Sequence, residues 1–134
     1  MASSRGSCLC ERVSFTALFP SLWVAHCHCT RCQRAHGAAF VTWVGFAESQ
    51  VKMEGREELR WFVASKGGSR GFCGHCGSPM FFKSGRWPGQ LHIARALFHG
   101  AIDRNPQTHM FYETHVPWTL ACDELPKKFS KPQS

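Results

Sequence analysis

The chain has 134 residues, of which 43% are hydrophobic and 13% aromatic, and its formal charge is +7 at pH 7. A chain of this length fits one compact core, so we expect a single domain over residues 1–134. A charged fraction of 19% is too low for a disordered chain, and no apolar run approaches the roughly 20 residues that span a bilayer.

The amino terminus lacks the apolar stretch of a secretion signal, and the longest apolar candidate, 18–25, is interrupted by Pro20 and Ser21. We therefore expect a cytoplasmic, reducing setting, where eight cysteines are more often metal ligands than disulfides. The basic residues are scattered, with only Lys127 and Lys128 adjacent. This pattern favours a solvated surface over nucleic-acid binding, and we expect no membrane partner.

Short apolar and β-branched segments recur along the chain, separated by Gly, Pro and Ser. This spacing predicts an antiparallel, mostly β domain. The expected strands are, in chain order, 13–18, 40–46, 50–53, 59–64, 80–83 and 91–97. One short helix is expected over 30–36, with Thr30 as its N-cap and Gly37 as its stop. The polar tail after Pro126 is expected to be frayed.

Seven of the eight cysteines fall into three clusters, which read C-L-C, C-H-C-T-R-C and C-G-H-C. Their cysteines are Cys8, Cys10, Cys27, Cys29, Cys32, Cys73 and Cys76. Cysteines two or three residues apart on a tight turn can point at one ion, and Gly74 and Gly77 supply the backbone freedom that such a turn needs. Cys122 stands alone, and we expect it to be a packed or inert thiol.

Structural zinc prefers four thiolates, so two of these clusters must combine to complete one site. In one division Cys8, Cys10, Cys73 and Cys76, here called the quartet, make a closed site. Cys27, Cys29 and Cys32, the triplet, then leave a fourth position open to water or a substrate thiol. Every other division leaves one pair with only two ligands, so ligand counting favours the first. A histidine could still fill the fourth place, the candidates being His26, His28, His36 and His75.

The plain alternatives are a single structural zinc, a redox pair or disulfides. Three clusters in one short chain, together with the absence of a secretion signal, favour two zinc ions per chain over each of these alternatives. One zinc would be structural and the other would face a substrate.

Four stretches also carry a resemblance to a known family: G-S-C-L-C, C-H-C-T-R-C-Q-R-A-H-G-A-A-F, G-F-C-G-H-C-G-S-P-M-F-F and H-V-P-W. In order and spacing they resemble the glutathione-dependent formaldehyde-activating enzyme (GFA) family, which includes centromere protein V. The resemblance runs from Gly6 to about Phe129 and implies small antiparallel sheets around zinc, as in the Mss4 fold. It also implies the same division into a structural quartet and a substrate-facing triplet. The chain departs from the family at Glu11, since a glycine commonly follows the first C-x-C.

The activity implied by the resemblance is that of a carbon-sulfur lyase, named for joining formaldehyde to glutathione. The triplet would then be catalytic, because coordination to a metal deprotonates a thiol. Arg31 and Arg34 are candidate partners for the glutathione carboxylates, with an ordinary exposed basic face as the alternative. His109 and Trp118 match family positions and are candidate pocket residues, with core packing as the alternative.

Three classes of function follow from these patterns. The first is a zinc enzyme whose partners are a thiol such as glutathione and a small electrophile. The second is a non-catalytic module that binds zinc or glutathione, which would leave the rate of adduct formation unchanged. The third is a cytoskeletal or chromosomal interaction protein, which usually needs a long basic extension that we do not expect here. A homo-oligomer is left open.

Overall fold

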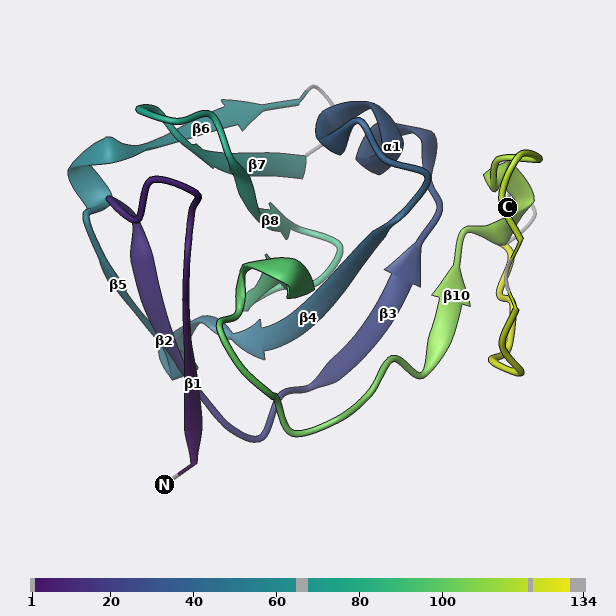
Figure 1. Ribbon diagram of the computed structural model, residues 1–134, viewed down its shortest axis with the longest axis horizontal. Coiled ribbons are helices and arrows are strands. Elements are labelled where there is room, and N and C mark those ends of the chain that lie inside the picture. The colour runs from purple at the N-terminus through teal and green to yellow at the C-terminus, as the bar shows by residue number, and fades with distance from the viewer. Residues whose placement is uncertain (1, 65–67, 121, 131–134) are drawn as a thin grey trace.

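The computed structural model describes residues 2–64, 68–120 and 122–130 (Figure 1). Its strands are β1 (Ser3–Ser7), β2 (Ser14–Leu18), β3 (Trp23–Cys27), β4 (Val41–Ala47), β5 (Val51–Glu54), β6 (Leu59–Val63), β7 (Gly68–Cys73), β8 (Pro79–Ser84), β9 (Gln90–Ala94) and β10 (Thr108–Met110). Its helices are α1 (Thr30–His36) and the short 3-10 turns η1 (Glu48–Gln50), η2 (Arg56–Glu58), η3 (Arg95–Leu97) and η4 (Tyr112–Thr114). None of the described helices has the length and apolar character that crossing a bilayer requires.

The strands form a three-stranded sheet in the order β1-β2-β5 and a seven-stranded sheet in the order β10-β3-β4-β9-β8-β7-β6. The predicted mostly β fold is confirmed. Neighbouring strands are antiparallel, except that β10 runs parallel to β3, which the antiparallel prediction missed. This pair arises because a long connection crosses the molecule between β9 and β10 and returns the chain in the direction of β3 (Figure 1).

The helix α1 has the predicted bounds, but its N-cap is Cys29 and not Thr30. The Cys29 side chain accepts a hydrogen bond from the backbone N–H of Cys32, as a capping side chain does. At the other end, Gly37 takes the left-handed conformation, with φ 61°, that stops a helix. The cap therefore fixes one of the triplet cysteines at the start of the helix.

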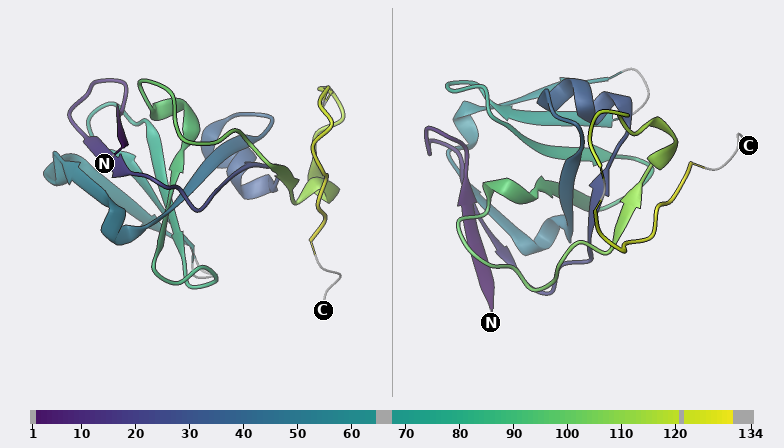
Figure 2. Two further views of the ribbon diagram at one scale, coloured as in Figure 1. Left: turned by 90° about the horizontal axis from the view of Figure 1, so that it is seen from below. Right: turned by 45° about the vertical axis from the view of Figure 1, so that its right-hand side comes forward.

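The carboxyl-terminal segment is more ordered than its polar sequence predicts. The N–H of His109 donates to the carbonyl of Pro126 at 2.8 Å, and the N–H of Lys128 donates to the carbonyl of His109 at 2.6 Å. These bonds hold the segment beside β10, where it covers the edge of the larger sheet (Figure 2). The prediction of a frayed tail is therefore wrong for residues 127–130, and 131–134 lie outside the described residues.

The buried core divides into two clusters, of which the larger lies between the two sheets. In the larger cluster, Phe15 of β2 packs edge-on against Phe81 of β8 and against Phe98, with ring centroids 5.8 and 5.1 Å apart. Fully burying such a side chain contributes about 1.5–3 kcal/mol, so these contacts join the small sheet to the large one. Cys8 and Cys73 belong to this cluster, whereas Cys27 and Cys32 belong to the smaller one.

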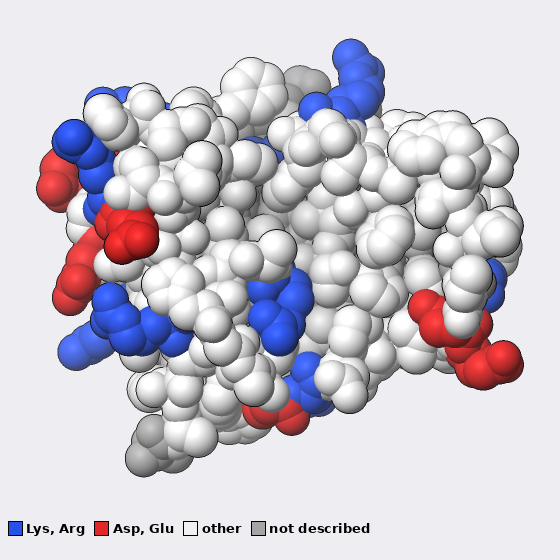
Figure 3. All heavy atoms as spheres, in the orientation of Figure 1, with Lys and Arg blue, Asp and Glu red and all other residues white. Residues whose placement is uncertain are grey.

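The surface shows no basic stripe on the face drawn in Figure 3, where Lys and Arg are dispersed among acidic and uncharged side chains. A nucleic-acid interface would gather basic residues on one face or along one element.

Candidate functional site

The quartet is built from two tight turns that different sheets bring together. The first turn follows β1, where the N–H of Glu11 donates to the carbonyl of Cys8 at 3.1 Å. The second follows β7, where Gly77, with φ 81°, donates its N–H to the carbonyl of Cys73 at 2.8 Å. Each turn therefore directs two cysteine side chains to the same point between the sheets.

The sulfur atoms of the quartet have the spacing that tetrahedral zinc requires. All four lie within 4.8 Å of one another, and the Sγ of Cys10 lies 3.7 Å from that of Cys8 and 3.8 Å from that of Cys73. Zinc–sulfur bonds of about 2.3 Å in a tetrahedron place the sulfurs about 3.8 Å apart. These separations are far too long for a disulfide, and all eight cysteines are free. The quartet therefore fits a closed structural zinc site.

Glu11 lies in the first turn with a left-handed backbone, a conformation that favours glycine. Its φ is 68°, in the left-handed region where an ordinary side chain costs roughly 1–2 kcal/mol. The turn therefore forms with a glutamate at this position, at a cost in backbone strain that a glycine would not have.

The triplet lies where β3 runs into α1. Cys27 ends the strand, Cys29 caps the helix and Cys32 lies in its first turn. Their three Sγ atoms lie within 4.8 Å of one another. Cys27 and Cys32 are buried, whereas Cys29 is half-buried. The geometry suits a metal ion held by three thiolates at the end of the strand.

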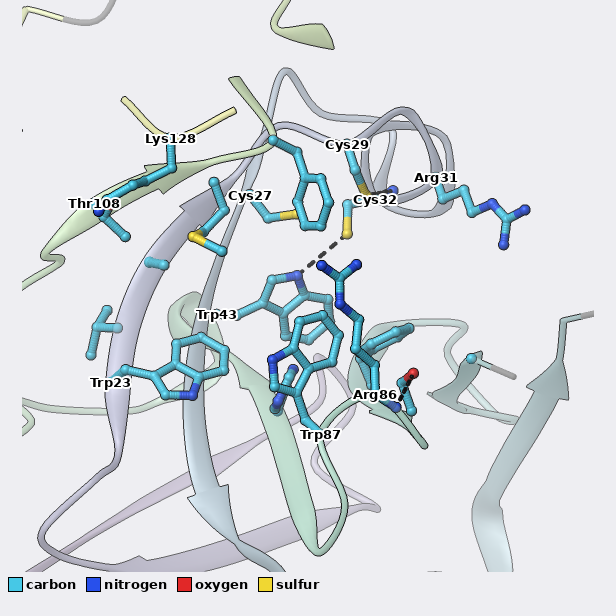
Figure 4. A pocket seen from close by; sticks show the side chains of 18 of the residues that line it. Trp23, Cys27, Cys29, Arg31, Cys32, Trp43, Arg86, Trp87, Thr108 and Lys128 are labelled. Carbon is cyan, nitrogen blue, oxygen red and sulfur yellow. Dashed lines mark hydrogen bonds between the residues drawn. The ribbon is translucent and has the colours of Figure 1, made fainter. Parts of the chain in front are cut away.

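Donors surround the sulfur of Cys32. The indole Nε1 of Trp43 donates to this sulfur at 3.4 Å (Figure 4). The guanidinium Nη2 of Arg70 donates to the same sulfur at 3.6 Å. Hydrogen bonds from the Cys27 and Cys29 thiols, followed by Trp43 and the positive charge of Arg70, hold the pKa of Cys32 far below its usual range. The site therefore stabilises a thiolate at this position.

The fourth position of the triplet is not filled by any of the described residues, since no other Cys, His, Asp or Glu groups with its three sulfurs. His36 packs edge-on against Trp43, with ring centroids 5.3 Å apart, and burial lowers its pKa to about 4. The ring of His28 forms a hydrogen bond with that of His109, and His26 lies close to His109 and Asp123, so neither completes the triplet. The triplet instead faces a cavity of about 1010 Å³.

Aromatic residues form part of the wall of this cavity, and the side chains of Trp23, Trp43 and Trp87 line it together (Figure 4). Gly45 makes room for the indole of Trp23, since a Cβ at Gly45 would collide with that ring. Phe111 completes the wall from a left-handed backbone with φ 56°. Such strain in a bulky residue concentrates at functional sites.

Four cationic side chains also line the cavity: Arg31, Arg70, Arg86 and Lys128. The guanidinium of Arg86 lies over the rings of Trp87 and Phe111, at 5.1 and 5.6 Å from their centroids. The Nη1 of Arg70 is buried and has no hydrogen-bond partner among the described residues. An anionic ligand with an apolar portion matches this lining.

Comparison with known protein families shows which family the chain belongs to. The family model described as glutathione-dependent formaldehyde-activating enzyme matches residues 3–114. The chain belongs to this family. A solved structure of a Rhodobacter sphaeroides protein is similar to it with a TM-score of 0.61 and 20% identity, over 72% of this chain and 89% of that chain. This likeness shows the fold, and the comparison with curated proteins gives no significant match.

The structure places the predicted substrate residues of this GFA family member in different surroundings. Arg31 lines the large cavity. Arg34 is exposed on the same helix and does not line it. His109 is only 2% exposed and lines a smaller cavity. Trp118 is 71% exposed and lines neither cavity. Of these four, Arg31 alone faces the triplet's cavity.

Sequence reasoning missed Arg70, Arg86 and the aromatic wall. Arg70 lies only three residues before Cys73, yet it contacts the other cysteine cluster. The pairing of β7 with β8 and the position of α1 create that contact, and no local spacing encodes either. The only signal in the sequence was the large number of tryptophans and phenylalanines, which the core alone could explain.

Proposed function

We propose that the chain binds glutathione, or a related thiol, in the large cavity and catalyses the joining and separation of its sulfur and a small aldehyde such as formaldehyde. The observation that carries this proposal is the triplet, whose open side faces a cavity lined by cations and indoles. Family membership supports the thiol and the aldehyde as substrates. Free cysteines suit a reducing compartment, so we place the protein in the cytoplasm.

The triplet would hold the substrate-facing zinc and the quartet the structural one. When bound, zinc at the triplet would supply Lewis-acid stabilisation of a thiolate at neutral pH. Side chains of the protein would also stabilise the negative charge on the thiolates, because Trp43 and Arg70 both donate hydrogen bonds to the sulfur of Cys32.

The cationic residues of the cavity would orient the thiol. Glutathione carries two carboxylates, and charge-assisted hydrogen bonds from guanidinium groups are among the strongest that a protein can offer. The unpartnered Nη1 of Arg70 lies beside the triplet, whereas Arg31 and Arg86 offer cations elsewhere on the lining. Binding at these groups would hold the sulfur near the triplet and leave the indoles to exclude water from the reacting carbon.

The reaction itself needs no oxidant or reductant. In the forward direction the sulfur–carbon bond forms, the carbonyl π bond breaks, and the oxygen takes up one proton to replace the proton that the thiol released. In reverse the hydroxyl proton is lost, the carbonyl forms again, and the sulfur leaves as a thiolate that is protonated in solution. Positioning and charge stabilisation are therefore all that the protein must supply.

The test is the rate at which S-(hydroxymethyl)glutathione forms from glutathione and formaldehyde, compared with the spontaneous rate. We expect the wild type to accelerate this step, Cys29→Ser to return it to the spontaneous rate, and Cys122→Ser to remain active. Cys122 is the matched control because it is exposed and lies outside both cysteine clusters. A wild type that binds glutathione without accelerating the reaction would be a binding module.

A further inference from the structure

A group of imidazoles lies at the edge of the larger sheet, apart from both cysteine clusters. Side chains alternate along a strand, so His26 lies on the opposite side of β3 from Cys27. His109 of β10 is its register partner, and the two rings lie 4.9 Å apart between centroids. Asp123 reaches the same place from the carboxyl-terminal segment. We propose that His26, His109 and Asp123 form a third metal site, for a divalent transition-metal ion such as Zn²⁺.

The ligand atoms of these three residues are close enough to share one ion. One atom from each lies within 4.8 Å of the other two, and the Nε2 of His109 lies 3.1 and 3.2 Å from the two carboxylate oxygens of Asp123. Zinc bonds to nitrogen and oxygen of about 2.0–2.2 Å in a tetrahedron place the ligands roughly 3.3–3.6 Å apart. The His109–Asp123 pair already has nearly this spacing, so a small adjustment of the three side chains would complete three of the ion's bonds.

Both histidines are oriented as metal ligands usually are. A histidine that binds a metal through one ring nitrogen almost always hydrogen-bonds through the other, which fixes its tautomer. The Nδ1 of His26 lies 2.7 Å from the hydroxyl oxygen of Thr42. The Nδ1 of His109 lies 2.8 Å from the Nε2 of His28. In His26 this leaves Nε2 for an ion, whereas in His109 Nε2 faces the Asp123 carboxylate and would share the ion with it.

A small cavity adjoins two of the proposed ligands, and His28 forms part of its wall. This side chain is only 4% exposed, and its Nδ1 has no hydrogen-bond partner among the described residues. It lines a cavity of about 80 Å³ that His109 and Asp123 also line. A buried polar atom without a partner is costly, and a cavity of this size has room for more than one water-sized occupant. The cavity therefore leaves room beside His109 and Asp123 for a water molecule, which could satisfy His28 and complete the shell of an ion held by the three ligands.

The ligand set indicates the class of ion. Two imidazoles and one carboxylate suit Zn²⁺, Co²⁺, Ni²⁺ or Fe²⁺, whereas Mg²⁺ and Ca²⁺ prefer oxygen ligands alone. Such an ion would tie β3, β10 and the carboxyl-terminal segment together at the sheet edge (Figure 1). No cysteine belongs to this ligand set, so the ion's spectrum would differ from that of an ion in the quartet or the triplet.

Cobalt titration of the protein loaded with only two equivalents of zinc, which the thiolates of the quartet and the triplet take up first, tests this site. We expect the wild type to take up one added equivalent of Co²⁺ without the intense charge-transfer absorption of a cobalt–thiolate bond. Asp123→Asn should weaken this binding at least tenfold, and so should His26→Asn, whose amide can keep the bond to Thr42. Glu124→Gln is the matched control, because it removes the neighbouring exposed carboxylate and should bind Co²⁺ as the wild type does.

Three outcomes would overturn the proposal: no added equivalent in the wild type, an added equivalent that shows thiolate charge transfer, or normal binding in both variants. Asp123 is exposed, so its replacement by Asn should leave the fold intact. If His26→Asn loses its zinc and its fold, the Asp123→Asn result decides. The proposal does not depend on the lyase activity, since the readout is metal binding alone.

Discussion

Arg70 and Cys32, 38 residues apart in the sequence, meet at the triplet, where the Nη2 of Arg70 lies 3.6 Å from the sulfur of Cys32. The Arg70 guanidinium also lies over the ring of Phe82, with its central carbon 4.9 Å from the ring centroid, so it is held from two sides. A fixed cation beside a buried sulfur favours the thiolate and leaves one guanidinium edge for a substrate carboxylate.

Replacing Arg70 should therefore weaken thiol binding. A charge-assisted hydrogen bond contributes about 1.5–3 kcal/mol, so Arg70→Gln should weaken glutathione binding roughly 10- to 100-fold in calorimetric titration. Arg70→Lys should recover only part of the loss, because an ammonium cannot contact sulfur and carboxylate as a planar fork does. Arg60→Gln removes an exposed arginine outside the cavity lining and is the control. Equal affinity in Arg70→Gln and Arg60→Gln would exclude this role.

Arg31 and Arg34 offer a matched pair on one short helix. Only Arg31 lines the cavity, so Arg31→Ala should weaken glutathione binding several-fold more than Arg34→Ala. Both substitutions remove one positive charge, so they weaken the long-range attraction of the anionic ligand equally. A difference between the two variants therefore measures the direct contact. Equal effects of the two variants would show that the contribution is only long-range, and no effect of either would remove this helix from the binding site.

The two cysteine clusters should differ in what their loss does to stability. Cys73 is completely buried between the sheets, so Cys73→Ser should lower the free energy of unfolding by at least about 3 kcal/mol through loss of a structural zinc. Cys29→Ser should cost only about 1 kcal/mol, because serine remains a good N-cap for α1. Urea unfolding of both variants measures the difference. A Cys73→Ser protein as stable as the wild type would argue against a structural metal in the quartet.

Glu11→Gly should stabilise the protein, because Glu11 holds a left-handed backbone. Relief of this strain is partly offset by the greater backbone freedom of glycine in the unfolded chain, so we expect a net gain of about 0.5–1 kcal/mol. Glu11→Ala removes the same side chain but keeps the strain and should give no gain. Thermal unfolding of the zinc-loaded proteins compares the two, and similar midpoints would contradict the strain argument.

The pH dependence of stability should carry a contribution from His92. Burial lowers the pKa of His92 to about 4, whereas the same side chain has a pKa of about 6.5 in an unfolded chain. Between these values the unfolded state binds more protons, so stability falls as the pH drops from about 6.5 to 4, by about 3 kcal/mol. His92→Gln can keep the bond to Gln90 and should flatten this slope in urea unfolding. An unchanged slope would show that His92 is not held neutral in the folded protein.

The features that sequence predicts best are those set by neighbouring residues. The bounds of the helix from Thr30 to His36 and its stop at Gly37 were predicted correctly, although the N-cap is Cys29 and not Thr30. The cysteine pairs follow from the spacing of tight turns. Ligand counting also found the division into quartet and triplet before any geometry was considered. The helix stop and the cysteine turns need no information about distant parts of the chain, whereas the division between the two sites needs a count of the cysteine clusters along the whole sequence.

The features that sequence missed depend on distant partners. The strand β7 contains Gly68, Ser69 and Gly71, which have low strand propensity, and it forms because β6 and β8 pair with it on both sides. The strand β10 is only three residues long and exists through its parallel pairing with β3. The contact of Arg70 with the triplet depends on the same long-range pairing, so no local pattern could have revealed it.

The most direct test of the open site is the number of thiolate-bound metal ions per chain in the wild type and in Cys29→Ser, counted by cobalt substitution and elemental analysis. We predict that the wild type holds one equivalent more than Cys29→Ser, and that glutathione changes the charge-transfer spectrum of the wild type alone. The same count in both proteins, with no response to glutathione, would mean that the triplet is not a metal site and would remove the basis of the proposed activity.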